Sequence, residues 1–189
     1  MRFFIVFVLL FCSGYSFAQK KLNFGKVIGQ PISTCRDPKN PVCESPYQLD
    51  IYWTAASPMF GSSTTIHLTF DGKKWAATQY HKTLQKKSDT IKLIPAISYD
   101  SIFNALKKNR IFTLPDQDSL QLKFFVLDGS DYTLVFKAGN EFRRYKFNNP
   151  DIHKESNPTV KELDYYIAII KIFGTGFKEQ PSANQGVEK

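Results

Sequence analysis

The sequence predicts a single α+β domain of mainly antiparallel strands with two helices packed on the sheet. Short alternating segments bounded by turn residues indicate strands, and two longer segments with helical spacing indicate helices. We expect the order βββα-βββα between residues 47 and 177. Asp-Gly turns at residues 71 and 128, 57 residues apart, hint at a duplicated unit, although two hairpins arising by chance explain the spacing equally well.

The first 18 residues have the layout of a secretory signal peptide cleaved after Ala18. Arg2 precedes an apolar run, FFIVFVLLFC, and small residues lead to the cleavage point. The run is shorter than the roughly 20 residues of a membrane span. A lipid anchor on Cys12 is the alternative, which Phe11 disfavours because lipoprotein processing wants a small residue nearby. We therefore expect an exported bacterial protein, periplasmic or secreted, with no membrane span in the mature chain.

The chain is basic, with 25 Lys and Arg against 17 Asp and Glu and a formal net charge of +8. A basic surface favours anionic partners, such as an acidic protein, an anionic envelope polymer, lipid head groups or nucleic acid. Nucleic acid is the least expected of these. Composition does not choose among the others, and it does not predict an oligomeric state.

An arm, residues 19–46, and a polar tail, residues 178–189, flank the predicted domain, and we expect the tail to be disordered. The arm holds the two cysteines that remain after cleavage, Cys35 and Cys43. An even count in an exported chain predicts a disulfide. A metal-binding pair is the weaker alternative, because zinc sites usually space paired cysteines by two to four residues and need further ligands.

Three strands are expected before the first helix, over residues 47–54, 64–70 and 73–81, and residues 89–94 are a candidate for a further short strand. The clearest hairpin surrounds the turn Asp71-Gly72, a pair that suits a type I′ turn. A two-residue loop there places Leu68 opposite Trp75 and Ile66 opposite Ala77, which gives a consistent apolar face.

The stretch from Leu120 to Phe147 predicts three antiparallel strands joined by two tight turns. A two-residue loop at Gly139-Asn140 sets three pairs: Phe136 with Arg143, Leu134 with Tyr145, and Tyr132 with Phe147. A three-residue loop at 128–130 would set three more: Val126 with Tyr132, Phe124 with Leu134, and Leu122 with Phe136. A one-residue slip would move the apolar residues to the other face, so the pattern specifies the register strongly.

Two helices follow from capping signals and apolar spacing. The first is expected to be capped by Ser98 or Asp100 and to end near Asn109. The second is expected to start with Asn157 as its N-cap and to run to about Phe173.

The sequence contains no motif that indicates catalysis, and it predicts no cofactor or metal site. It lacks the serine, lysine, zinc and phosphate-loop motifs G-x-S-x-G, S-x-x-K, H-E-x-x-H and G-x-x-x-x-G-K. In the expected hairpin, His67 and His81 lie on opposite faces and cannot share a metal. Acidic residues gather in turns, where capping of the backbone is their ordinary role: Asp116, Asp118, Asp128 and Asp131.

The remaining candidate site is a sheet surface on which basic and apolar side chains alternate. Its candidate binding residues are Lys123, Lys137, Phe142, Arg144 and Lys146, with Phe125 and Val135 between them. Such a surface binds an acidic protein or polymer, or nucleic acid by stacking and phosphate contacts. The alternative is that Phe125, Val135 and Phe142 are covered by the rest of the chain while the long basic stems extend over the rim.

These observations favour an exported, non-catalytic binding protein of the bacterial envelope that uses the basic sheet surface on an acidic protein or anionic polymer. A small secreted hydrolase using the carboxylates near Asp116 and Asp128 is one alternative. A structural or assembly subunit, whose sheet edge pairs with another chain, is the other.

Overall fold

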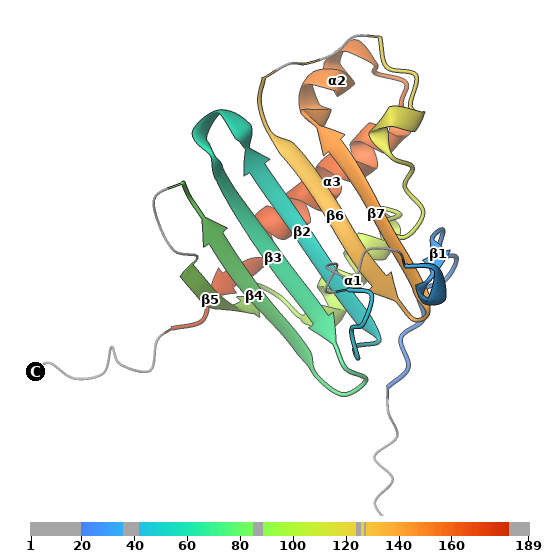
Figure 1. Cartoon of the computed structure of the whole chain (residues 1–189), viewed down its shortest axis with the longest axis vertical. Coiled ribbons are helices and arrows are strands. Elements are labelled where there is room, and N and C mark those ends of the chain that lie inside the picture. Colours follow the sequence, from blue (N-terminus) through green and yellow to red (C-terminus); the bar gives the residue numbers. More distant parts are fainter. Residues whose placement is uncertain (1–19, 36–41, 85–88, 124–125, 127, 182–189) are drawn as a thin grey trace, which may run out of the picture.

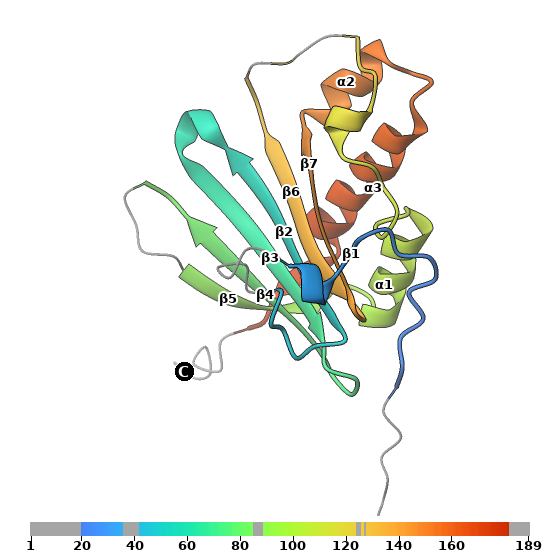
Figure 2. The ribbon, with the colours of Figure 1, turned by 45° about the vertical axis from the view of Figure 1, so that its right-hand side comes forward.

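Within the described residues, 20–35, 42–84, 89–123, 126 and 128–181, this computed structural model of the chain forms one eight-stranded sheet with three helices on one side (Figures 1 and 2). The strand order is β1-β7-β6-β2-β3-β4-β5-β8, and neighbouring strands run antiparallel. The predicted α+β class with a mainly antiparallel sheet is confirmed.

The strands in chain order are β1 (Gln30–Pro31), β2 (Leu49–Ser57), β3 (Ser62–Phe70), β4 (Trp75–Lys82), β5 (Asp89–Pro95), β6 (Asp131–Ala138), β7 (Glu141–Asn148) and β8 (Phe177–Glu179). The helices are α1 (Tyr99–Lys108), α2 (Pro150–Ser156) and α3 (Lys161–Thr175). Three short 3-10 turns are η1 (Ile32–Thr34), η2 (Pro58–Phe60) and η3 (Gln117–Ser119). In the described part of the chain, no helix is both long and apolar enough to cross a membrane.

The sheet has a core face and an open face. Ile51 of β2 pairs with Leu68 of β3 and with Phe136 of β6, and all three side chains are fully buried. Their neighbours along each strand point the other way, because side chains alternate across a strand. The helices lie together against the core face, as Figure 2 shows, and no described helix covers the open face.

The first helix follows its predicted cap. The Ser98 hydroxyl accepts a hydrogen bond from the Ser101 amide at 3.1 Å, so Ser98 rather than Asp100 is the N-cap. Ile102 and Leu106 are four residues apart on one side of α1 and are buried in the core.

Helix α3 differs from the predicted second helix at its start. It begins at Lys161, and Asn157 instead ends the short helix α2, which the sequence did not predict. The fully buried residues of α3 are Leu163, Tyr166, Ile169 and Phe173. The Phe173 ring stacks on Trp53 of β2, with ring centroids 5.1 Å apart, and thereby fixes α3 on the centre of the sheet.

The β6–β7 hairpin confirms the register predicted from Gly139-Asn140, with all three expected pairs present. The strand predicted to precede β6, over residues 120–127, is wrong: none of the described residues in this range lies in a strand. Strand β2 occupies that position and pairs with β6 along eight residues. Leu120 and Leu122 pack against the core from a loop instead, while Phe124 lies outside the described residues.

The β3–β4 hairpin has the predicted turn but a register shifted by two residues. Phe70 pairs with Trp75 and Leu68 pairs with Ala77, so the connection has four residues instead of two. The reason is the Asp71 carboxylate, which accepts hydrogen bonds from the Lys73 and Lys74 amides, each at 2.7 Å, and so holds both residues in the turn. A shift of two keeps every side chain on its predicted face.

The predicted order βββα-βββα is not confirmed. Among the described residues, four long strands precede α1, only two strands lie between α1 and α2, and β8 follows α3. The two Asp-Gly turns therefore do not mark equivalent positions of a repeat. Strand β8 pairs with β5 through Glu179, so regular structure continues past the predicted start of the tail at residue 178.

Candidate functional site

The open face carries most of the predicted basic surface. Phe142, Arg144 and Lys146 alternate along β7 with the buried Tyr145 and Phe147, and they therefore point to the open side. Lys137 of β6 joins them, because it lies directly opposite Phe142. Lys123 is the exception.

Lys123 lies beside the helices, away from the open face. Its backbone amide donates a hydrogen bond to the Asn157 side chain at 3.2 Å, and Asn157 ends α2. Phe125, which the sequence placed near it, lies outside the described residues. The five candidate residues thus divide into four on the open face and one on the helical side.

Two of the four have partners inside the protein. The Lys146 ammonium forms an ion pair with Asp131 at 2.9 Å. The Lys137 ammonium donates to the Ser45 carbonyl, and its burial lowers the pKa of Lys137. Arg144 is exposed and makes no ion pair with any described residue, so it is the cation most available to a ligand.

The strand register aligns Arg144 with one residue on each of five further strands, and these six residues form a row across the sheet. The row reads Arg144, Val135, Tyr52, His67, Thr78 and Lys92, each opposite the next on neighbouring strands β7, β6, β2, β3, β4 and β5. We call it the central row. Its two ends are cations, and five inter-strand spacings of about 4.8 Å place them roughly 24 Å apart.

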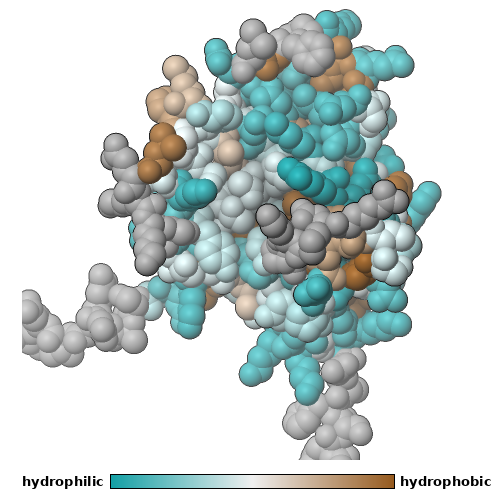
Figure 3. Space-filling model, viewed as in Figure 1, coloured by the Kyte–Doolittle hydropathy of each residue, from teal (hydrophilic) through white to brown (hydrophobic). Residues whose placement is uncertain are grey.

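A second row runs beside the central row, and each of its residues is two positions away from the central-row residue on the same strand. It reads Lys146, Thr133, Thr54, Thr65, Tyr80 and Thr90, and we call it the hydroxyl row. The Thr54 and Thr65 hydroxyls are 2.9 Å apart and share a hydrogen bond. Figure 3 looks onto this face, and its centre is mostly pale, with the deeper brown nearer its margins.

Near the middle of the central row, the buried carboxylate of Asp50 forms a hydrogen bond with the imidazole of His67. Asp50 Oδ1 lies 2.7 Å from His67 Nε2, and the Asp50 side chain is only 3% exposed while that of His67 is 16% exposed. An ionised carboxylate can only accept, so the proton of this hydrogen bond belongs to Nε2. In the neutral imidazole, Nδ1 is then the basic nitrogen.

The rings in the central row present their edges to solvent. Tyr52 and His67 stack with centroids 4.0 Å apart and planes 12° apart, and Tyr80 lies beside the imidazole at 6.4 Å. Because the two stacked residues are opposite each other on neighbouring strands, the ring faces point along the sheet and the edges point away from it. A ligand on this face meets hydroxyl groups and nitrogens, not flat ring surfaces.

The Tyr52 hydroxyl is held in its neutral form. Burial is the main cause and the nearby Asp50 carboxylate the second, and together they raise the pKa of Tyr52 well above its ordinary value. The hydroxyl therefore remains a hydrogen-bond donor across the physiological pH range.

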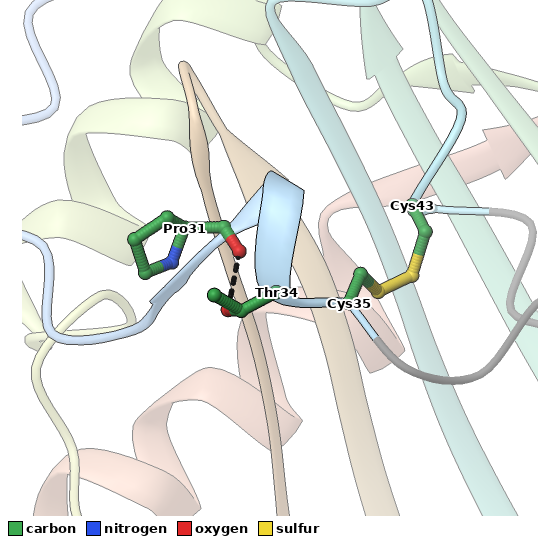
Figure 4. Close-up of a disulfide and its surroundings, with 4 residues drawn as sticks. All are labelled: Pro31, Thr34, Cys35 and Cys43. Atoms are coloured by element: carbon green, nitrogen blue, oxygen red, sulfur yellow. Dashed lines mark hydrogen bonds between the residues drawn. A yellow bond between two sulfur atoms is a disulfide. The ribbon is translucent and has the colours of Figure 1, made fainter.

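The disulfide arm borders one end of the open face. Cys35 and Cys43 are bonded, as predicted, with Cα atoms 6.0 Å apart (Figure 4). Val42 and Ser45 are buried beside this end of the sheet. A hollow of about 470 Å³ lies between the arm and Lys137.

Among the turn carboxylates considered for the hydrolase alternative, Asp116 accepts hydrogen bonds from backbone amides and Asp131 contacts side chains. Asp116 accepts hydrogen bonds from the amides of Asp118 at 3.4 Å and of Lys146 at 3.3 Å, which fastens η3 to the outer edge of β7. Asp131 accepts from Asn148 at 2.8 Å besides its ion pair with Lys146. No group of three His, Cys, Asp or Glu side chains that could hold a metal ion occurs among the described residues.

Sequence analysis missed the Asp50–His67 pair because it did not pair the predicted strands 47–54 and 64–70 with each other. In the structure, Pro58 to Gly61 join β2 to β3 directly, and that hairpin places Tyr52 opposite His67. The available signal was the matched alternation of residues 47–54 and 64–70, which would have paired the two segments.

In comparisons with known proteins, no protein-family model, no curated protein and no solved structure matches the chain. The functional argument therefore rests on the residues of the open face.

Proposed function

We propose that the protein is an exported, non-catalytic binding protein of the bacterial envelope, and that its open face binds an anionic polymer rich in hydroxyl groups. The observation that supports this most directly is the central row, in which Arg144 and Lys92 stand at opposite ends of a line that includes Tyr52, His67 and Thr78. The disulfide supports an oxidising, extracytoplasmic location.

The charge balance of the open face favours an anionic ligand. Its acids, Asp50 and Asp131, already have partners in His67 and Lys146. Arg144 and Lys92 are exposed and have no acidic partner among the described residues. An anionic chain lying along the central row would therefore meet two unneutralised cations without displacing an internal ion pair.

The shape and chemistry of the face favour a polymer over an acidic protein. The central and hydroxyl rows cross six strands, and all their side chains except Val135 end in hydroxyl groups, rings, or ammonium or guanidinium groups. Protein interfaces instead rely on large apolar anchors in pockets. A glycan with carboxylate groups matches the hydroxyl groups by hydrogen bonding and the cations by charge.

The test measures binding of the chain from residue 19 to polygalacturonate, a carboxylate-bearing glycan, with uncharged dextran as the control polymer. We expect binding to polygalacturonate alone, weaker at higher salt. The variant Arg144→Glu/Lys92→Glu should lose binding by roughly tenfold or more, which corresponds to about 1.4 kcal/mol. Both side chains are exposed, so the melting temperature should not change.

A charge-matched control separates the face from the net charge. Lys161→Glu/Lys171→Glu makes the same charge change on exposed positions of α3, in the helical layer. Equal loss in both double variants, or no binding by the unmodified protein, would overturn the proposal. Binding to poly-glutamate that equals or exceeds binding to polygalacturonate would instead assign the face to an acidic protein.

A further inference from the structure

A second surface lies at one end of the sheet, where the β2–β3 and β4–β5 hairpins end. Met59 and Phe60 of η2 are 79% and 72% exposed, and Leu84, two residues after the end of β4, is 83% exposed. These are the three most exposed large apolar side chains among the described residues. We call them the apolar tip.

The apolar tip is one continuous feature. A Cβ atom added at Gly61 would lie only 2.4 to 2.8 Å from three Leu84 carbons, so the Leu84 side chain rests directly on the glycine that ends η2. Brown and tan atoms project together at the upper left of Figure 3, where these two hairpin ends lie in Figure 1. The two hairpins thus present one apolar surface.

The apolar tip is also preformed. Pro58 opens η2, and the Gly61 amide donates back to the Pro58 carbonyl at 3.2 Å. Gly61 has a φ of 56°, a left-handed conformation that glycine adopts without strain. The chain therefore holds Met59 and Phe60 outward at little further cost in conformational entropy when they are buried.

A hollow of about 370 Å³ lies beside the apolar tip and is lined in part by Leu84. Its lining is mostly apolar but also includes the polar side chains of Ser57, Ser62, Ser63 and Lys82. The segments 56–63 and 82–84 contain no acidic residue. An apolar projection with serine hydroxyl groups and one cation beside it matches the two layers of an anionic lipid surface, in which acyl chains lie deeper and phosphate groups lie nearer the protein.

We propose that this end of the sheet docks on the surface of an anionic lipid membrane, with Met59, Phe60 and Leu84 inserted among the acyl chains and Lys82 near the phosphate groups. Charge favours this occupant, since the chain carries a formal net charge of +8. The shape favours it over a protein partner. A stable protein interface buries more than about 1,000 Å² with complementary packing, and three side chains on a projecting turn do not supply such a surface.

The first test is co-sedimentation of the chain from residue 19, which lacks the predicted signal peptide, with vesicles of phosphatidylglycerol and phosphatidylethanolamine. Vesicles of phosphatidylcholine alone are the uncharged comparison. We expect binding to the anionic vesicles, and we expect Met59→Ser/Phe60→Ser/Leu84→Ser to weaken it by roughly tenfold or more. Lys82→Glu should weaken it as well, and this effect should diminish at high salt.

The matched control is Ile97→Ser. Ile97 is 70% exposed but lies beyond the opposite end of β5 from Leu84, so its loss should leave vesicle binding unchanged. A spectroscopic readout complements it: Phe60→Trp should show blue-shifted emission with anionic vesicles, and Ile97→Trp should not.

Three outcomes would overturn the proposal. The first is that the unmodified protein does not bind anionic vesicles, and the second is that the triple variant binds them as well as the unmodified protein does. The third is a mass in solution that rises with protein concentration for the unmodified protein but not for the triple variant, which would make the apolar tip a contact between copies of the chain. Polygalacturonate binding should be unaffected by the triple variant, so the two proposals fail independently.

Discussion

The Asp50–His67 hydrogen bond offers the sharpest test of the open-face geometry. Replacing Asp50 with alanine removes a carboxylate that is almost fully buried and leaves His67 Nε2 without its acceptor at 2.7 Å. The conservative variant Asp50→Asn keeps an oxygen that can accept the same hydrogen bond, but it removes the charge. The two variants therefore separate the hydrogen bond from the electrostatic contribution.

The magnitude follows from burial and charge. A hydrogen bond to a charged, buried acceptor contributes about 1.5 to 3 kcal/mol, and a stranded donor adds a desolvation cost. His67 is partly exposed, so water offsets some of that cost. We expect Asp50→Ala to lower the free energy of unfolding by about 2 to 3 kcal/mol, or the melting temperature by about 4 to 12 °C for a chain of this size. Asp50→Asn should cost about 1 kcal/mol.

The assay is urea unfolding of Asp50→Ala, His67→Ala and the double variant, followed by circular dichroism. The interaction energy of this cycle should be at least about 1.5 kcal/mol, because each single variant removes the same hydrogen bond. A value below about 0.5 kcal/mol would mean that the two residues act independently, and the described geometry of the central row would then be wrong.

Three further predictions concern the arm, the core and the response to acid. The variant Cys35→Ser/Cys43→Ser should lose about 2 to 3 kcal/mol through the entropy of the opened loop, and an unchanged urea midpoint would contradict this. Phe173→Ala, which removes a buried ring stacked on Trp53, should cost about 3 to 5 kcal/mol, and an unaltered melting temperature would show that α3 does not pack there. Burial lowers the pKa of His153 below 6.5, so the unfolded state binds more protons and stability should fall as the pH drops below about 6.5. His153→Gln should flatten this decline in urea unfolding at pH 7.5 and 5.0, and an identical decline in both proteins would refute the assignment.

Local features of the sequence predicted their own structures well. Alternating side chains identified β2 to β7, Gly139-Asn140 specified the β6–β7 register, and Ser98 capped α1. In each case the deciding interaction lies between residues a few positions apart, in a turn, a cap or one strand. The disulfide between Cys35 and Cys43 also belongs to this group, since only one pairing was available.

The partner of each strand was decided by the tertiary structure. Strand β6 pairs with β2 in the position that sequence analysis assigned to residues 120–127. Both β2 and residues 120–127 carry apolar residues at suitable positions. Backbone hydrogen bonds are alike for any two strands, so the choice depends on which arrangement buries most apolar surface across the whole sheet. Helix α2 was not predicted, although Pro150 is a favourable first helical residue.

The same distinction applies to the candidate sites. The sequence by itself determined the basic balance of the chain, the alternation that points Arg144 and Lys146 away from the core, and the cysteine pair of the arm. Only the tertiary structure joined Arg144 to Lys92 in one row, Asp50 to His67 in one hydrogen bond, and Gly61 to Leu84 in one tip. Side-chain direction is a property of each strand, whereas these contacts require strands from distant parts of the chain to lie side by side.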